Sequence, residues 1–336
     1  MAARVVLVAG FTQHDVADEV WRASPDSVLV RHDLSRLADG VVRRWVDGRL
    51  TVLELAHGCV SCTLRLDLVP LLEGLDARVV VHLDPALEPE AVCFALSATE
   101  VEVEAVLTVV DPARWLADAT GGDTLAERGM GAAAEDERTV AQVVVGQAEF
   151  ADALVLTAAP DPATAAVLER LNPLAPRQQL DGIDVPALLA AIPATARRGG
   201  FDDGFGSLLY GAPPLHAAHG VSVVCFSEAR PFHPMRLHKA VDVLLDGVVR
   251  TRGRVWVVSQ PDEALWLESA GGGLRVGNLG AWPRDRGQEL VVITTKDPVR
   301  ITAALTAAVV TDEELALADE LDFVDPFGEW HEEAEL

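Results

Sequence analysis

The sequence predicts a two-domain α/β protein, in which a mostly parallel sheet with helices on both faces is followed by a smaller α+β domain. The chain has 336 residues, and single hydrophobic cores rarely grow beyond ~250 to 300 residues. Half of the residues are hydrophobic and 24% are charged, a composition typical of packed globular proteins. Short apolar runs alternate with helical segments through the first half of the chain, as they do in doubly wound sheets.

The first domain is expected to begin with a core strand. Residues 4–9 form an apolar run that ends at Gly10, and such runs are typical of parallel strands buried on both faces. Similar runs predict strands at 27–30, 50–55, 78–83, 105–110 and 153–157. The segments between them, and the one after the last, predict helices at 16–23, 63–74, 112–118, 135–150 and 161–171.

A linker is expected after residue 198, where Gly199-Gly200 and a Gly- and Asp-rich stretch follow an Ala- and Pro-rich segment. Beyond it, strands are predicted at 221–226, 254–259, 265–269, 273–276 and 289–295, with helices at 234–246 and 297–308. The run Gly271-Gly272-Gly273 predicts a hairpin turn. We therefore expect a first domain at 1–198, a linker at 199–218, a second domain at 219–316 and an acidic, loosely held tail at 317–336.

The charge and cysteine content limit the class of partner. The chain carries 52 acidic and 27 basic residues, a net charge of −25, which would repel the phosphate backbone of free nucleic acid. Such acidity promotes solubility, and it also suits a cationic partner or a metal. No uncharged apolar run approaches the ~18 residues of a membrane span, and the apolar run before Gly10 is short, so we expect neither a membrane span nor a signal peptide. With four cysteines in the chain, we expect a protein of the reducing cytoplasm.

Two of the cysteines form the clearest chemical motif. Cys59 and Cys62 lie three positions apart, after a predicted strand and a glycine and before a predicted helix. Backbone N–H groups at a helix start stabilise thiolates, and two thiolates at this spacing can bind one tetrahedral ion. Redox dithiols use the same spacing, and simple packing is a third alternative.

A two-thiolate site needs further ligands to bind zinc. His57 is the nearest candidate, followed by Glu54, and His82 and Cys93 are more distant ones. A third protein ligand plus water would leave an open, exchangeable site. Each of these four residues also fits an ordinary structural role, as a polar group at a strand end or a buried small thiol.

The segment from Glu54 to Arg65 resembles the metal-binding C-x-C-C segment of the CobW-type metallochaperone GTPases. Cys59 and Cys62 match the first and last thiols of that segment, Ser61 replaces the middle one, and His57 stands where Asn is usual. Further segments resemble the family in matching order: 107–111, 147–152, 171–173, 230–237, 253–256 and 288–291. The resemblance covers nearly the whole chain, and it implies a P-loop-GTPase-like sheet, a CobW C-terminal domain and bound Zn²⁺.

The nucleotide motifs depart from that family. A phosphate-binding loop needs G-x-x-x-x-G-K-[ST]. The corresponding segment of this chain, residues 10–18, has no second glycine and no lysine, and it carries Asp15 and Asp18. Residues 82–85 replace the family's Glu-Ser/Thr-x-Gly, and residues 157–160 replace its guanine-reading Asn-Lys-x-Asp. We expect no bound nucleotide and no hydrolytic activity.

These features lead to three functional hypotheses. The first is a zinc-responsive pseudo-GTPase that serves as a metal-homeostasis accessory or metallochaperone for a protein client. The second is a ribosome-associated factor that recruits a hibernation factor to the small subunit in zinc starvation, as the resemblance to actinobacterial members of the family implies. The third is a GTPase with an unorthodox phosphate loop.

Overall fold

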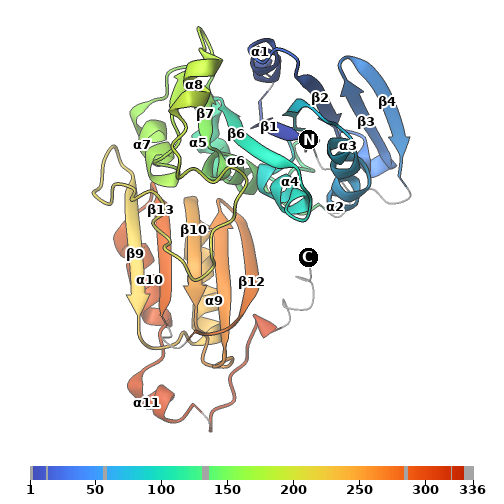
Figure 1. Ribbon diagram of the computed structural model, residues 1–336. Coiled ribbons are helices and arrows are strands. Elements are labelled where there is room, and N and C mark those ends of the chain that lie inside the picture. The colour runs from blue at the N-terminus through green and yellow to red at the C-terminus, as the bar shows by residue number, and fades with distance from the viewer. Residues whose placement is uncertain are drawn as a thin grey trace.

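Two β-sheets organise the chain, one in each half, and Figure 1 shows the second sheet below the first. The computed structural model describes residues 3–12, 14–55, 59–130, 136–283, 287–318 and 320–328. The first sheet has eight strands in the order β4-β3-β2-β5-β1-β6-β7-β8. Its strands are β1 (Arg4–Gly10), β2 (Val28–Asp33), β3 (Val41–Val46), β4 (Arg49–Glu54), β5 (Arg78–His82), β6 (Glu102–Val110), β7 (Ala153–Leu156) and β8 (Arg177–Gln179).

The centre of the first sheet is parallel and buried on both faces. β1 pairs in parallel with both β5 and β6, and all of its residues after Arg4 are buried. Continuous apolar strands form where helices cover both faces of a sheet. At one edge, β3 and β4 form an antiparallel hairpin whose turn is Asp47-Gly48, with φ of 47° and 79°.

Helices cover the two faces of this sheet. α1 (Val16–Arg22) and α8 (Val185–Ala191) pack on one face, against Val6 and Val8 of β1. The other face packs against α4 (Pro89–Leu96) and a continuous helical segment made of α2 (Val60–Thr63), the π-helical η2 (Leu64–Leu68) and α3 (Val69–Glu73). A short 3₁₀ turn, η1 (Leu37–Asp39), follows β2.

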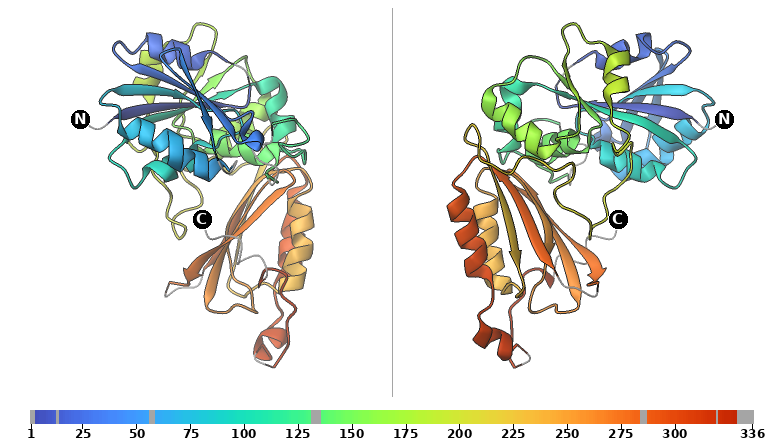
Figure 2. Two further views of the ribbon diagram at one scale, coloured as in Figure 1. Left: turned by 90° about the vertical axis from the view of Figure 1, so that its right-hand side faces the viewer. Right: turned by 60° about the vertical axis from the view of Figure 1, so that its left-hand side comes forward.

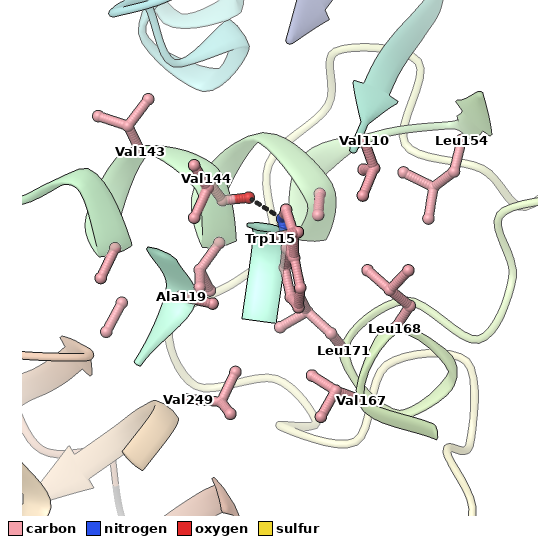
Figure 3. Close-up of a cluster of buried hydrophobic side chains, with 14 of the residues drawn as sticks. Val110, Trp115, Ala119, Val143, Val144, Leu154, Val167, Leu168, Leu171 and Val249 are labelled. Atoms are coloured by element: carbon pink, nitrogen blue, oxygen red, sulfur yellow. Dashed lines mark hydrogen bonds between the residues drawn. The ribbon is translucent and has the colours of Figure 1, made fainter. Parts of the chain in front are cut away.

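A further cluster of buried hydrophobic side chains joins three helices to the second sheet. The helices are α5 (Pro112–Ala119), α6 (Val140–Phe150) and α7 (Pro162–Leu171). Figure 3 shows Trp115 at its centre, where the indole N–H donates to the carbonyl of Val144 at 3.1 Å. Val249, from the second sheet, belongs to the same cluster. The two halves therefore share this hydrophobic cluster.

The second sheet is antiparallel, with five strands in the order β12-β11-β10-β13-β9. Helices α9 (Pro234–Leu244) and α10 (Pro298–Ala308) lie together on one face of it, as Figure 2 shows. A short helix, α11 (Asp312–Ala316), follows. The strands are β9 (Ser222–Glu228), β10 (Val248–Val255), β11 (Glu263–Ala270), β12 (Gly273–Ala281) and β13 (Gln288–Thr294).

Several predicted elements need correction. The strand predicted at 50–55 is the edge strand β4 of the first sheet, and it is antiparallel to β3, a strand that is not predicted from the sequence. The helix predicted at 135–150 begins at Val140, because Thr139 forms a capping box with Gln142. Residue 135 itself lies outside the described residues. The strand predicted at 254–259 is placed too late in the chain. The observed strand β10 spans Val248–Val255 and shares only residues 254 and 255 with the prediction.

The expectation of a loosely held tail is wrong for residues 325–327. Phe327 is 1% exposed and belongs to the core of the second domain. The carboxylate of Asp325 accepts hydrogen bonds from the Ser259 hydroxyl at 2.5 Å and the Gln260 amide at 2.7 Å. An apolar side chain among acidic neighbours anchors this part of the tail. The exact domain limits at 198, 218 and 316 stay a prediction.

Candidate metal centre and the neighbouring cavity

Cys59 and Cys62 lie side by side at the start of the helical segment 60–73. Their sulfurs are joined as a disulfide, and their Cα atoms are 5.3 Å apart. Cys59 is the N-cap residue of α2, with extended backbone angles of φ −118° and ψ 145°. Its sulfur accepts a hydrogen bond from the backbone N–H of Cys62 at 2.9 Å. The structure thus brings together the two sulfurs that the sequence motif singled out.

The local sequence explains this placement. The hydroxyl of the fully buried Thr63 donates to the carbonyl of Cys59 at 2.9 Å, which fixes the first turn of the helix. Leu64 and Leu68 bury the helix against the sheet, whereas Ser61 is exposed and both cysteines are partly exposed. The sulfurs are therefore held by a packed helix at a position that solvent can reach.

The other predicted ligands are not gathered around the sulfurs within the described residues. Glu54 is exposed at the end of β4, and His57 lies outside the described residues. Cys93 is buried in α4, and burial raises the pKa of its thiol to about 12, so it is a packing residue. His82 lies in a separate cavity. No group of three His, Cys, Asp or Glu side chains within the described ranges has the geometry of a metal site, so the roles of Glu54 and His57 stay predictions.

A cavity of about 410 Å³ opens at the carboxyl ends of β1, β2 and β5. This is the edge of a parallel sheet at which ligands bind in open α/β folds. Its lining includes three histidines, from the loop after β1 and from strands β2 and β5. The lining residues are Thr12, His14, Arg31, His32, Asp33, Ser35, Trp45, His82, Leu83, Asp84, Pro85, Gly129 and Met130.

His14 and His82 form a neutral ring pair in this cavity, with ring centroids 4.7 Å apart. Burial is the main reason that the pKa of His14 is lowered to about 3 and that of His82 to about 4; the neighbouring His82 contributes for His14, and the adjacent Arg31 guanidinium contributes for both. Arg31 is itself paired: it donates to His82 Nδ1 at 2.9 Å and to the Asp18 carboxylate at 2.5 Å. Arg31, the arginine among the described residues that line the cavity, therefore has its charge balanced by a carboxylate.

His14 also covers the end of β1. A Cβ placed on Gly10 would lie 2.9 Å from His14 Nε2, so the imidazole sits directly over that glycine. Both ring nitrogens of His14 are buried, and neither has a hydrogen-bond partner among the described residues. In a phosphate-binding loop this space is lined by backbone N–H groups that face the phosphates.

A buried ion pair links the cysteine-bearing helix to the cavity. Asp67 lies in η2, five residues after Cys62, and its carboxylate contacts His32 Nε2 at 3.0 Å and also Arg44. His32 lines the cavity from β2. The π-helical turn that carries Asp67 is a feature often found at functional sites. No local motif identifies His14, Arg31, His32 and Asp67, because they come from three separate places in the chain: the loop after β1, strand β2 and the π-helical η2.

Two family models match this chain. The model described as "CobW/HypB/UreG, nucleotide-binding domain" matches residues 19–179, and the one described as "Cobalamin synthesis protein cobW C-terminal domain" matches residues 221–309. A Mycobacterium tuberculosis protein named "Zinc chaperone Rv0106" is 43% identical, and the match covers 99% of this chain and 94% of that protein. The chain belongs to the CobW family.

More distant members and structures extend this comparison. A Dictyostelium discoideum protein named "Zinc-regulated GTPase metalloprotein activator 1" is 24% identical to this CobW-family chain, over 82% of this chain and 70% of that protein. The solved structure of the Zn(II)-bound YjiA GTPase from E. coli is 15% identical and covers 92% of this chain and all of that chain, with a TM-score of 0.43. Membership confirms the predicted family and the P-loop-GTPase-like fold class with its second domain. Within the described part of the chain, no helix has the length and apolar character to cross a bilayer.

Proposed function

We propose that this chain is a zinc-binding metallochaperone or metal-homeostasis accessory that holds its ion at Cys59 and Cys62. The observation that carries the proposal is the pair of adjacent, partly exposed sulfurs at the start of a packed helix. The names of the relatives, one a zinc chaperone and one a zinc-regulated metalloprotein activator, support zinc as the ion and a protein as the client.

The chemistry of the donors fits zinc. Zn²⁺ is a borderline-soft ion that binds thiolates in tetrahedral geometry, and structural sites surround it with four protein ligands. Two thiolates leave two positions for weaker ligands, for which His57 and Glu54 are the proposed candidates, or for water. A site that is open in this way can exchange its ion with a client, and a closed four-thiolate site exchanges more slowly.

Zinc analysis of the reduced, full-length protein tests this proposal. We expect one zinc ion per chain in the wild type and in Cys225→Ser, because Cys225 lies in the second domain and is exposed. The double variant Cys59→Ser/Cys62→Ser should lose the ion while its circular dichroism spectrum stays that of the wild type. A double variant that kept one ion per chain would refute the proposed site.

We further propose that the chain does not hydrolyse GTP. The missing glycine, lysine and Ser/Thr of the phosphate loop support this proposal, and so do the His14 ring over Gly10 and the Asp18 carboxylate beside Arg31. Calorimetric titration should detect no binding at millimolar GTP with Mg²⁺. Micromolar affinity for GTP in a nucleotide-free preparation would contradict it.

A ribosome-linked output stays a prediction that rests on the family resemblance. Sedimentation of extracts from zinc-depleted and zinc-replete cells tests it directly. Migration with small subunits only after zinc depletion would favour this output, and migration at the top of the gradient under both conditions would exclude it.

A further inference from the structure

The two sulfurs that are proposed to bind an ion are also placed to bind each other. Cys59 and Cys62 are joined in the structure, and their Cα separation of 5.3 Å lies within the range in which a disulfide forms without movement of the backbone. The other two cysteines have no such partner among the described residues: Cys93 is buried in α4 and Cys225 is exposed on β9. The same pair can thus exist as a dithiol or as a disulfide.

The surroundings of Cys59 favour reaction at this pair. The Cys62 N–H donates to the Cys59 sulfur at 2.9 Å, at the first turn of a helical segment that runs to Glu73. Such donors stabilise a thiolate, which is the reactive form of cysteine. Ser61 between the two cysteines is exposed, so a small reagent can approach. Cys93 has the opposite environment, since burial raises the pKa of its thiol to about 12.

We propose that Cys59 and Cys62 undergo thiol–disulfide exchange with low-molecular-weight disulfides, and that formation of the intramolecular disulfide releases the bound metal. Release of the metal, the second step, rests on the proposed zinc site. Formation of the disulfide, the first step, needs only the two sulfurs.

The chemistry balances in two steps. The Cys59 thiolate attacks one sulfur of the small disulfide, R–S–S–R, to form a mixed disulfide and expel one R–S⁻. The Cys62 thiolate then attacks the Cys59 sulfur and expels the second R–S⁻. Two thiolates of the protein lose two electrons in total, and the small disulfide gains them. The disulfide sulfurs carry no negative charge and no longer bind Zn²⁺ as thiolates do, so the ion would lose its two strongest ligands and leave the site.

The experiment uses full-length protein with the background substitution Cys225→Ser, both zinc-loaded and metal-free, and oxidised glutathione as the probe. Intact-mass spectrometry follows the thiols, and a chromogenic chelator follows released zinc. We expect one zinc ion to be released for each disulfide formed, and dithiothreitol to restore zinc binding. In the metal-free protein, Cys59 and Cys62 should react before Cys93, because they are partly exposed at a helix start whereas Cys93 is 2% exposed.

Single substitutions test the order of attack. In Cys62→Ser, we expect one stable glutathione adduct on Cys59, because no second thiol can displace it. Cys59→Ser should form an adduct more slowly, since the helix-start contact to the Cys59 sulfur is lost.

The outcomes separate this proposal from the proposed function. If the metal-free dithiol failed to form a disulfide while the protein still bound zinc, the exchange proposal would be overturned and the zinc site would stand. Disulfide formation with zinc retained would overturn the release step. If no zinc bound at all, the proposed function would fail, and disulfide formation in the metal-free protein would still decide the exchange step.

Discussion

His14 and His82 line the cavity of the first domain. Both imidazoles are neutral near pH 7, with pKa values of about 3 and about 4, chiefly because of burial. Arg31, the nearest fixed cation, is paired with Asp18. A triphosphate would find no uncompensated positive charge on these residues, which agrees with the proposed loss of GTP hydrolysis.

The same two histidines should make folding stability depend on pH. Each has a folded-state pKa below its ordinary value of 6.5, so the unfolded chain binds more protons as pH falls below ~6.5. The stabilisation is complete above pH ~6.5 and is lost on acidification, at up to about 1.4 kcal/mol per pH unit for each histidine. Urea unfolding of the wild type and of His14→Gln/His82→Gln between pH 5 and 7 measures this effect. Equal pH slopes for the two proteins would show that the histidines are not buried as neutral groups.

At the scale of elements, the β11–β12 hairpin is the clearest contact between the halves of the chain. Its turn, predicted from Gly271-Gly272-Gly273, lies against residues 119–122 and the start of α6. The Gly272 N–H donates to the Gly121 carbonyl at 2.9 Å. Gly271 adopts φ +51°, and a Cβ there would meet the Gly121 carbonyl oxygen and the Ala141 side chain. Glycine is therefore required both by the backbone and by the close approach.

Gly271→Ala should destabilise the protein by about 2 kcal/mol or more, because strain at positive φ adds to the overlap with Gly121. Gly277→Ala is the matched control: Gly277 lies in the same hairpin, on β12, and a Cβ there would meet no atom within 4 Å. We expect the control to change stability by less than about 0.5 kcal/mol. Chemical denaturation of both variants measures the difference, and equal stabilities would mean that the hairpin tip is not packed as the structure has it.

The sequence predicted some elements well, for clear physical reasons. Strands β1, β5 and β7 are continuous apolar runs, because they are buried on both faces, and α9 and α10 begin near helix-start signals. The β3–β4 hairpin was missed although Asp47-Gly48 is a strong turn signal, since its strands are partly exposed and carry arginines.

The candidate site could be predicted only in its local part. Cys59 and Cys62 are three residues apart, so their spacing alone indicated that one helix start would bring them together. His14, Arg31 and His82 meet only because β1, β2 and β5 are neighbours in the sheet. Such a contact depends on strand order, which no local pattern encodes.

In the whole molecule, a buried charge network joins helix α6 of the first half to the second sheet. Glu149 of α6 pairs with Arg250 at 2.9 Å and with Arg252, both on β10. Burial alone would lower the pKa of Arg250, but the carboxylates of Glu149 and Glu268 raise it. Gln147, two residues before Glu149, donates to the carbonyls of Pro85 and Leu87, which follow the cavity-lining end of β5. The helix α6 thus contacts both the second sheet and the wall of the cavity.

Glu149→Gln should lower the free energy of unfolding by about 3 kcal/mol, because a neutral amide would replace the carboxylate that pairs with Arg250 and Arg252 in a buried site. The loss should appear as earlier unfolding, with reduced cooperativity between the domains, in scanning calorimetry. Asp246→Asn is the control, since the pair Asp246–Arg300 is more than half exposed and exposed pairs contribute ~0 to 1 kcal/mol. If the two variants had equal melting temperatures, the network would not join the domains.

If Cys59 and Cys62 bind the proposed zinc ion, two sulfur atoms lie in its first coordination shell. Zinc K-edge X-ray absorption of the reduced, zinc-loaded protein measures that shell. We expect two Zn–S distances of ~2.3 Å, with the remaining ligands being nitrogen or oxygen. A first shell of nitrogen and oxygen alone, at ~2.0 to 2.1 Å, would contradict it.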